Sequence, residues 1–141
     1  MNAGLDNLIP GFTETKSVYP SPDKAVLKIL TGPGNGRIFP LDKQSMIIGR
    51  EKPPEGSADL DLSDCELGEI PMISRRHAEI RWAGKNLEII DLGSLNGTWV
   101  DGKKLEPISL LCEPNYFILK YGTNIRFANL EAEITNRPTL E

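Results

Sequence analysis

Hydrophobic residues occur along this chain in short runs, and most runs end at a turn-forming sequence. The first run, residues 25–30, is followed by Thr31-Gly32-Pro33-Gly34-Asn35-Gly36, which is rich in residues that favour turns. Residues 77–82 alternate between apolar and polar positions, and no window keeps the period of an α-helix. The pattern therefore predicts short β-strands joined by turns.

The predicted strands reach nearly to the end of the chain. Asp101-Gly102 is typical of a two-residue hairpin turn. One further short strand is expected around residues 58–62, inside a long excursion between residues 50 and 71. Many short strands with closely spaced turns are typical of an antiparallel sandwich or barrel. The expected strands are residues 25–30, 37–41, 45–49, 77–82, 86–91, 98–100, 103–105, 116–119, 124–128 and 130–134.

The length of 141 residues suits one domain with a sizeable core. Residues 1–23 are rich in Gly, Pro, Ser, Thr and Asn and lack an apolar period, so we expect a flexible N-terminal tail. The domain is expected over residues 24–136, with residues 137–141 as a C-terminal tail. The apolar runs are too short for a transmembrane helix, and the N-terminus lacks the features of a secretory signal.

Charge and cysteine content narrow the functional classes. The formal net charge of −4 disfavours general nucleic-acid binding, which needs a basic face. Cys65 and Cys112 form no Cys-x-x-Cys pair, which favours a reducing cytoplasm and gives no sign of a zinc site. The single histidine, His77, has no evident nucleophile or acid beside it in the sequence. We therefore expect no catalysis, no cofactor and no metal.

Three sequence blocks lie at the borders of the apolar runs: Ile47-Ile48-Gly49-Arg50, Ile73-Ser74-Arg75-Arg76-His77-Ala78 and Asp91-Leu92-Gly93-Ser94-Leu95-Asn96-Gly97-Thr98-Trp99. They supply two cations, a hydroxyl and a side-chain amide. A phosphate dianion has three strong acceptor oxygens, and charged donors bind it best. The blocks therefore contain the donors needed to hold a phosphate and the peptide that carries it.

Each block also has an ordinary explanation when it is taken alone. Arg50 would be a solvated surface cation, and Ser74 could simply begin a strand. Asn96-Gly97 is a common hairpin turn. The occurrence of all three blocks, in order and each at a strand–loop border, favours recognition of a phosphorylated peptide by loops on a rigid scaffold.

The order Gly-Arg, Ser-x-x-His and Ser-x-Asn-Gly resembles the forkhead-associated (FHA) domain, over roughly residues 24–136. This resemblance implies an all-β fold, a two-sheet antiparallel sandwich of about 11 strands with the recognition loops at one end. It also implies a non-catalytic module that binds phosphothreonine peptides downstream of a Ser/Thr kinase. An alternative remains open: a phosphate-independent scaffold that binds partner proteins through a sheet face.

The resemblance assigns roles to individual residues. It assigns phosphate contacts to Arg50, Ser74 and Arg75. It further assigns the ligand main chain to Asn96, and a backbone contact to Leu95, at a position where many relatives carry threonine. The residues expected to support the site are Gly49, His77 and Gly97.

The N-terminal tail contains candidate phosphorylation sites. Glu14-Thr15-Lys16-Ser17-Val18 resembles the N-terminal segment of small bacterial FHA regulators, in which a phosphorylated tail occupies its own domain. Thr15, and less directly Thr13, is thus a candidate substrate of a Ser/Thr kinase. Phosphorylated Thr15 would occupy its own domain or bridge two chains, and the alternative is an inert leader.

Overall fold

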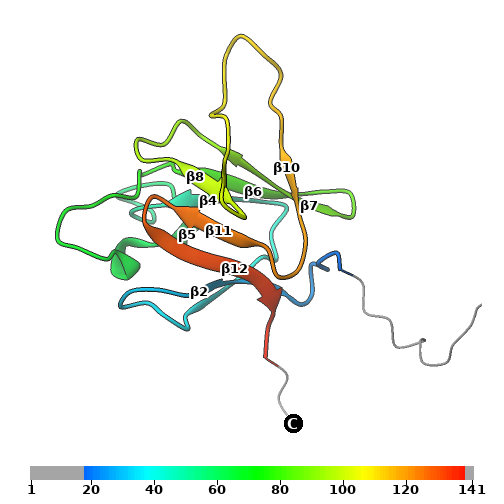
Figure 1. The fold of residues 1–141 in the computed structure, drawn as a ribbon, viewed down its shortest axis with the longest axis horizontal. Coiled ribbons are helices and arrows are strands. Elements are labelled where there is room, and N and C mark those ends of the chain that lie inside the picture. The colour runs from blue at the N-terminus through cyan, green and yellow to red at the C-terminus, as the bar shows by residue number, and fades with distance from the viewer. Residues whose placement is uncertain (1–17, 139–141) are drawn as a thin grey trace, which may run out of the picture.

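The computed structural model describes residues 18–138, which form two β-sheets packed face to face (Figure 1). A short 3₁₀-helix, Ser63–Cys65, follows β5. The strands are β2 (Ala25–Ile29), β3 (Ile38–Pro40), β4 (Ser45–Gly49), β5 (Leu60–Asp61), β6 (Ala78–Ala83), β7 (Asn86–Asp91), β8 (Thr98–Val100), β9 (Lys103–Lys104), β10 (Phe117–Leu119), β11 (Asn124–Phe127) and β12 (Leu130–Asn136).

The strands are divided between a five-stranded and a six-stranded sheet. The first has the order β10-β7-β6-β4-β5, and the second has the order β3-β2-β12-β11-β8-β9. Alternate side chains of each strand fill the space between the sheets. In β6, for example, Ala78, Ile80 and Trp82 are buried and the residues between them are partly exposed. The Trp82 indole N–H donates to the Leu41 carbonyl at 2.7 Å, which satisfies the polar atom of this buried ring.

Strand register brings three chain segments together at one end of the five-stranded sheet. Ile48 of β4 is paired with Ala78 of β6, and Ala78 is paired with Asp91 of β7. The segments that follow β4, precede β6 and follow β7 therefore lie together at this end of the sheet.

One end of the six-stranded sheet lies in the same region. Phe127, the last residue of β11, is paired with Thr98 at the start of β8. The next residue, Ala128, donates its N–H to the Gly97 carbonyl at 2.9 Å. The His77 ring lies edge-on to Phe127 with a centroid distance of 5.7 Å, so this contact joins the two sheets where the loops meet.

The N-terminal part of the described chain joins the domain at the opposite end. The Tyr121 N–H, in the turn before β11, donates to the Val18 carbonyl at 2.8 Å. The Tyr121 hydroxyl accepts from the Ser21 N–H at 3.2 Å, and Pro20 is buried. Figure 1 shows this blue segment on the right, away from the β4–β5 and β5–β6 connections on the left.

The predicted sandwich is confirmed, and the structure corrects its details. The β4–β5 pair is parallel, with Ile48 opposite Leu60, so the five-stranded sheet is mixed and not purely antiparallel. The reason is the long connection from residue 50 to residue 59, which brings the chain back beside Ile47 of β4 before β5 begins. The 3₁₀-helix was not predicted, and β12 runs two residues beyond the predicted residues 130–134.

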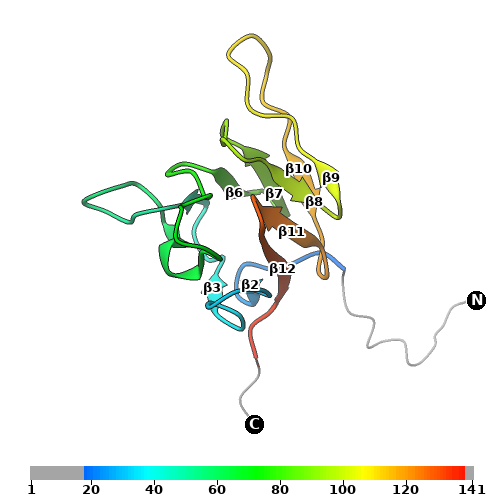
Figure 2. The same cartoon turned by 60° about the vertical axis from the view of Figure 1, so that its left-hand side comes forward.

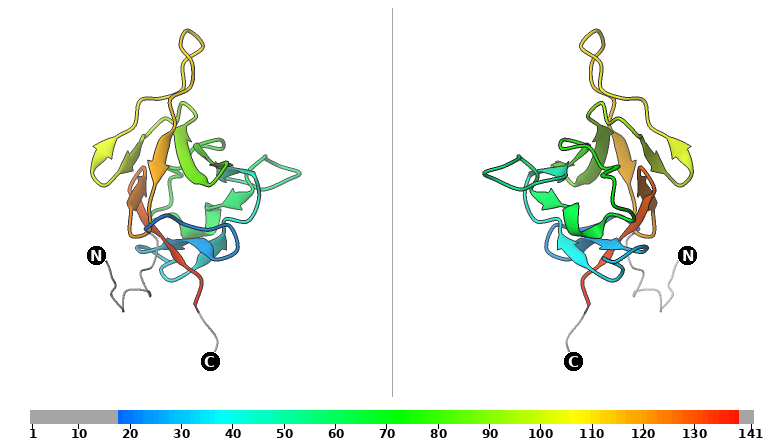
Figure 3. Two further views of the ribbon diagram at one scale, coloured as in Figure 1. Left: turned by 90° about the vertical axis from the view of Figure 1, so that its right-hand side faces the viewer. Right: turned by 90° about the vertical axis from the view of Figure 1, so that its left-hand side faces the viewer.

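The connection between β9 and β10 was not predicted as a feature, and it projects well beyond the sandwich (Figure 3). Its two leucines, Leu110 and Leu111, are almost completely exposed. At its base, the Ile108 N–H donates to the Asp91 carbonyl at 2.8 Å, which fixes the start of the projection to β7. Within residues 18–138, no helix is long and apolar enough to cross a membrane.

Candidate phosphopeptide-binding site

Three loops form the candidate site, and we call them the recognition loops: the β4–β5 connection (residues 50–59), the segment before β6 (residues 66–77) and the β7–β8 loop (residues 92–97). The first two extend from the same side of the molecule (Figure 2). Hydrogen bonds between the loops determine where the predicted site residues lie.

Arg50 lies directly beside Ser74. Its backbone N–H donates to the Arg75 carbonyl at 3.3 Å, and its Nε donates to the Ile73 carbonyl at 3.0 Å. Both neighbours of Ser74 are therefore bonded to Arg50. The Arg75 side chain is 66% exposed, whereas that of Arg50 is 26% exposed, so both guanidinium groups can reach solvent from this position.

Gly49 makes the close approach of these two segments feasible. A Cβ at this position would lie 2.0 Å from the Arg75 carbonyl oxygen and 2.9 Å from that of Ser74. No real Cβ tolerates such contacts, so a side chain here would push β4 away from the Ser74 segment. Gly49 therefore matters because it has no side chain.

Ser74 links the second recognition loop to the third. Its Oγ accepts the Leu95 N–H at 2.9 Å, so the serine hydroxyl keeps its hydrogen for another acceptor. The Leu95 side chain is 87% exposed and takes no part in this bond. The contact at Leu95 is therefore a backbone contact, and the leucine in place of threonine leaves it intact.

Asn96, in the β7–β8 loop, contacts the segment before β6. Its Nδ2 donates to the Met72 carbonyl at 2.9 Å, which fixes the amide plane. Among residues 18–138, no donor is recorded for the Asn96 amide oxygen, which can therefore accept an N–H from an incoming chain. The three loops that carry Arg50, Ser74, Arg75 and Asn96 are thus hydrogen-bonded to one another.

His77 holds the loops together from inside. Its Nδ1 accepts the Ser74 N–H at 3.1 Å, so the ring proton resides on Nε2, which donates to the Gly97 carbonyl at 2.8 Å. The ring is completely buried. Burial lowers the pKa of His77 despite the opposing effects of the Gly97 carbonyl and the nearby carboxylates. The neutral ring is the form that both hydrogen bonds require.

Gly97 adopts a positive φ of 89°, and a Cβ there would lie 2.7 Å from the Trp99 ring. Only glycine suits both the backbone conformation and the space. Its carbonyl accepts from His77 and from Ala128, so this residue is bonded to both sheets.

Asp91 holds the third recognition loop in place, and sequence analysis did not single it out. Its carboxylate accepts four hydrogen bonds in the β7–β8 loop, from the Gly93 and Ser94 N–H groups and the Ser94 and Thr98 hydroxyls. Burial acts to raise the pKa of Asp91, but these hydrogen bonds outweigh it and lower the pKa. An aspartate two residues before Gly-Ser is typical of side-chain-stabilised turns, and this signal was available in the sequence.

Glu51 is the second residue that was missed. Its carboxylate lies 3.1 Å from Arg75 Nε and 3.8 Å from Arg50 Nη1, so both cations of the site share one anion. Its backbone has a positive φ of 75°. A glutamate that follows Gly-Arg carries no sequence signal for such a position.

Asp61 fixes Glu51 in turn. The Glu51 N–H donates to Asp61 Oδ1 at 3.0 Å and to Ser63 Oγ at 3.1 Å. Burial acts to raise the pKa of Asp61, but hydrogen bonds from Ser63, Glu51 and Lys52 outweigh it and lower the pKa to about 2. Asp61 is therefore a carboxylate at every pH at which the domain would work.

Thr13 and Thr15 lie outside the described residues. Within residues 18–138, no group of His, Cys, Asp and Glu is arranged to hold a metal ion.

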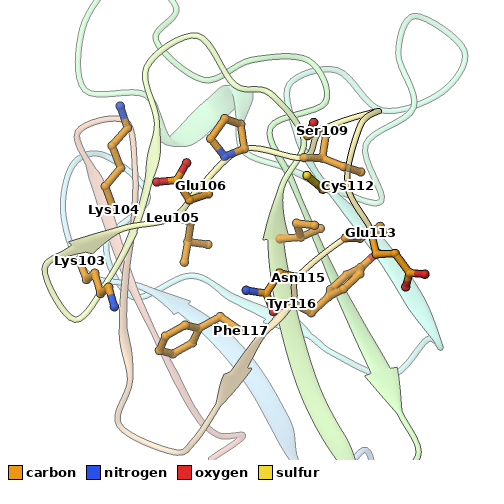
Figure 4. Close-up of a pocket in the computed structure, with 14 residues that line it drawn as sticks. Lys103, Lys104, Leu105, Glu106, Ser109, Cys112, Glu113, Asn115, Tyr116 and Phe117 are labelled. Atoms are coloured by element: carbon orange, nitrogen blue, oxygen red, sulfur yellow. The ribbon is translucent and has the colours of Figure 1, made fainter.

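A cavity of about 600 Å³ lies elsewhere, beneath the projecting β9–β10 connection (Figure 4). Ile90, on the outer face of β7, and Leu105, Ile108 and Phe117 supply apolar surface to it. None of Arg50, Ser74, Arg75 and Asn96 lines it, so it is separate from the recognition loops.

Comparison with known proteins agrees with this geometry. The model of the FHA domain family matches residues 46–128, which include all three recognition loops. The chain is 39% identical over 77 residues to an oxoglutarate dehydrogenase inhibitor of Corynebacterium jeikeium, covering 55% of this chain and 46% of that protein. It is 35% identical over 82 residues to the glycogen accumulation regulator GarA of Mycolicibacterium smegmatis, covering 58% and 46%. The chain thus spans slightly less than half of the length of these relatives.

Solved structures give the same assignment. One, from an analysis of phosphothreonine-dependent FHA domain interactions, has a TM-score of 0.60 and 30% identity and covers 82% of this chain and 99% of its own. The FHA domain of the CT664 protein from Chlamydia trachomatis has a TM-score of 0.62 and 28% identity, with coverage of 82% and 99%. The chain belongs to the FHA domain family.

Proposed function

We propose that this protein binds phosphothreonine peptides through its recognition loops and acts, without catalysis, as an adaptor or regulator downstream of a Ser/Thr kinase. The observation that carries the proposal is the grouping of Arg50, Ser74, Arg75 and Asn96 around one exposed surface. A family neighbour was analysed for phosphothreonine-dependent interactions, which supports the same ligand class.

Each residue has a definite task in this proposal. The Arg50 and Arg75 guanidinium groups provide charged donors, which bind phosphate oxygens about twice as strongly as neutral donors do. Ser74 donates its hydroxyl hydrogen to a phosphate oxygen, because its bond with the Leu95 N–H uses the oxygen as acceptor and leaves the hydrogen free. Asn96 accepts an N–H from the ligand main chain and so sets the register of the peptide.

The regulatory part of the proposal rests on the relatives, which are named as an inhibitor and as a regulator. A neighbouring FHA domain, that of FhaA, was solved in complex with the intracellular domain of another protein, with a TM-score of 0.58 and 31% identity. We extend this to partners that carry phosphothreonine, and we place the protein in the cytoplasm, where kinases and such partners meet.

A degenerate peptide library with one fixed phosphothreonine tests the proposal. The wild-type protein should be retained on this library and not on the same library with threonine. Arg50→Ala and Ser74→Ala should lose retention. Lys85→Ala is the matched control, because it removes an exposed cation in the β6–β7 turn, which lies at the other end of β6. Equal retention on both libraries would contradict the proposal and favour the phosphate-independent scaffold.

The protein's own tail is a further candidate ligand, through phosphorylated Thr15. The tail enters the domain at Val18, which is bonded to Tyr121 at the end opposite the recognition loops. Three residues from Thr15 to Val18 span at most about 11 Å. The four residues of β11 alone separate the two ends by roughly 14 Å at about 3.4 Å per residue. We therefore favour binding to a second chain over binding to the same domain.

A further inference from the structure

The two cations of the recognition site are already occupied by an internal anion. The Glu51 carboxylate lies 3.1 Å from Arg75 Nε through one oxygen and 3.8 Å from Arg50 Nη1 through the other. An incoming phosphate needs the same two guanidinium groups. Glu51 and a ligand anion therefore compete for the same donors.

The backbone of Glu51 is held in a fixed position. Its N–H is bonded to Asp61 and Ser63, and its carbonyl accepts the Ala58 N–H at 3.3 Å. Gly56 packs so closely that a Cβ there would lie 2.1 Å from the Glu51 carbonyl oxygen. The backbone of Glu51 is thus anchored, and its carboxylate stays within reach of the two arginines.

The conformation of Glu51 is one that glycine would adopt without strain. Its φ of 75° lies in the left-handed region, which costs a residue with a side chain some free energy. A glycine would adopt this backbone conformation without that cost, so glutamate is not the most stable residue at this position. The contact that the side chain makes is with the two arginines.

We propose that Glu51 is a specificity-determining residue that lowers the affinity of the site for every anionic ligand, so that singly charged ligands no longer bind measurably. A ligand carboxylate that displaces Glu51 exchanges one single negative charge for another and gains little. A phosphothreonine brings close to two charges and three acceptor oxygens, so it gains even after Glu51 is displaced. Glu51 therefore rejects acidic, unphosphorylated peptides. This inference rests on the proposed function.

The test uses the peptide selected from the phosphothreonine library, synthesised with phosphothreonine, threonine or glutamate at the fixed position. Glu51→Gln should strengthen binding of the phosphothreonine peptide by about threefold to tenfold, the effect of removing one or two exposed ion pairs. It should also give measurable binding of the glutamate peptide. Both affinities should rise by a similar factor, because the cost of displacing Glu51 is the same for the two ligands.

Glu55→Gln is the matched control. Glu55 lies in the same loop, is exposed, and has no ion pair recorded among the described residues, so this change removes the same charge without freeing the arginines. It should leave both affinities near the wild-type values. Glu51→Gly removes the carboxylate and suits the backbone conformation, so it gives the same result if Glu51→Gln folds poorly.

The outcomes separate this inference from the proposed function. If the wild type binds no phosphothreonine peptide, the proposed function fails. If the wild type binds the phosphothreonine peptide but Glu51→Gln and Glu51→Gly keep the wild-type affinities, only the role of Glu51 is wrong. Weaker binding of the phosphothreonine peptide by both variants would also overturn it, because Glu51 would then be holding the arginines in place for the ligand.

Discussion

Individual side chains in the recognition loops mainly hold backbone groups, and few are free to touch a ligand. His77 bonds Ser74 and Gly97, and Asp91 bonds the N–H groups of Gly93 and Ser94. These buried polar groups set the shape of the loops, because an unpaired buried donor or acceptor is costly.

The neutral state of His77 predicts a pH dependence of stability. Burial lowers the pKa of His77 in the folded protein below its unfolded value of about 6.5. As the pH falls below about 6.5, the unfolded chain binds a proton that the folded protein does not, so folding stability declines until the pH reaches the folded pKa. The free energy of unfolding, measured in urea between about pH 7.5 and about pH 5.5, should fall by up to about 1.4 kcal/mol per pH unit.

His77 is the only histidine in the chain, so His77→Gln should flatten this dependence. A nuclear magnetic resonance titration of the wild-type ring should give a pKa below the ordinary value of about 6.5. A ring that titrates at its ordinary pKa in the folded protein, or an unchanged slope in the variant, would contradict the assignment.

Site residues that belong to short sequence motifs could be predicted from the sequence. Site residues whose position depends on partners far away in the sequence could not. Arg50, Ser74 and Asn96 stand in short patterns at strand ends. Glu51 is defined by a left-handed backbone and by bonds to Asp61 and Ser63, which lie ten and twelve positions away. No local pattern specifies that geometry.

At the scale of elements, the recognition site depends on how closely β4 approaches the segment before β6. Gly49 permits this approach, since a Cβ would lie 2.0 Å from the Arg75 carbonyl. We expect Gly49→Ala to displace Arg50 and Arg75, to lower the free energy of unfolding by about 1–3 kcal/mol and to weaken phosphothreonine-peptide binding.

Gly68→Ala is the control for this change, because a Cβ at Gly68 meets nothing within 4 Å and the residue lies in the neighbouring loop. It should leave both stability and affinity near wild type. Thermal unfolding and peptide titration of the two variants would check the prediction. Gly49→Ala with wild-type stability and affinity would show that β4 does not need this contact.

Strands were predictable where apolar residues alternate, as in β6 and β12. The direction of β5 was not, because it depends on the path of residues 50–59 and not on the two residues of the strand. The projecting β9–β10 connection was also missed, since its leucines look like part of a core when only the sequence is read.

At the scale of the whole molecule, the first described residues, which follow the tail in the sequence, and the recognition loops lie at opposite ends of the sandwich (Figure 1). This separation predicts that phosphorylation of Thr15 joins two chains. Light scattering should give the mass of two chains for the phosphorylated protein and of one chain, 15.6 kDa, for the unmodified protein.

Phosphorylated protein that carries Ser74→Ala should remain a single chain, because the site that receives the tail is lost. A phosphorylated monomer with weakened peptide binding would mean that the tail reaches its own domain. A phosphorylated monomer with unchanged peptide binding would identify the tail as an inert leader.

The central claim is that the recognition loops bind phosphothreonine. Calorimetric titration of the wild-type protein with the library-selected peptide, once with phosphothreonine and once with threonine, tests it most directly. We predict binding of the phosphorylated form alone, and a loss of about 2–5 kcal/mol of binding free energy in Arg50→Ala. Equal affinity for the two peptides, or unchanged affinity in Arg50→Ala, would contradict the claim.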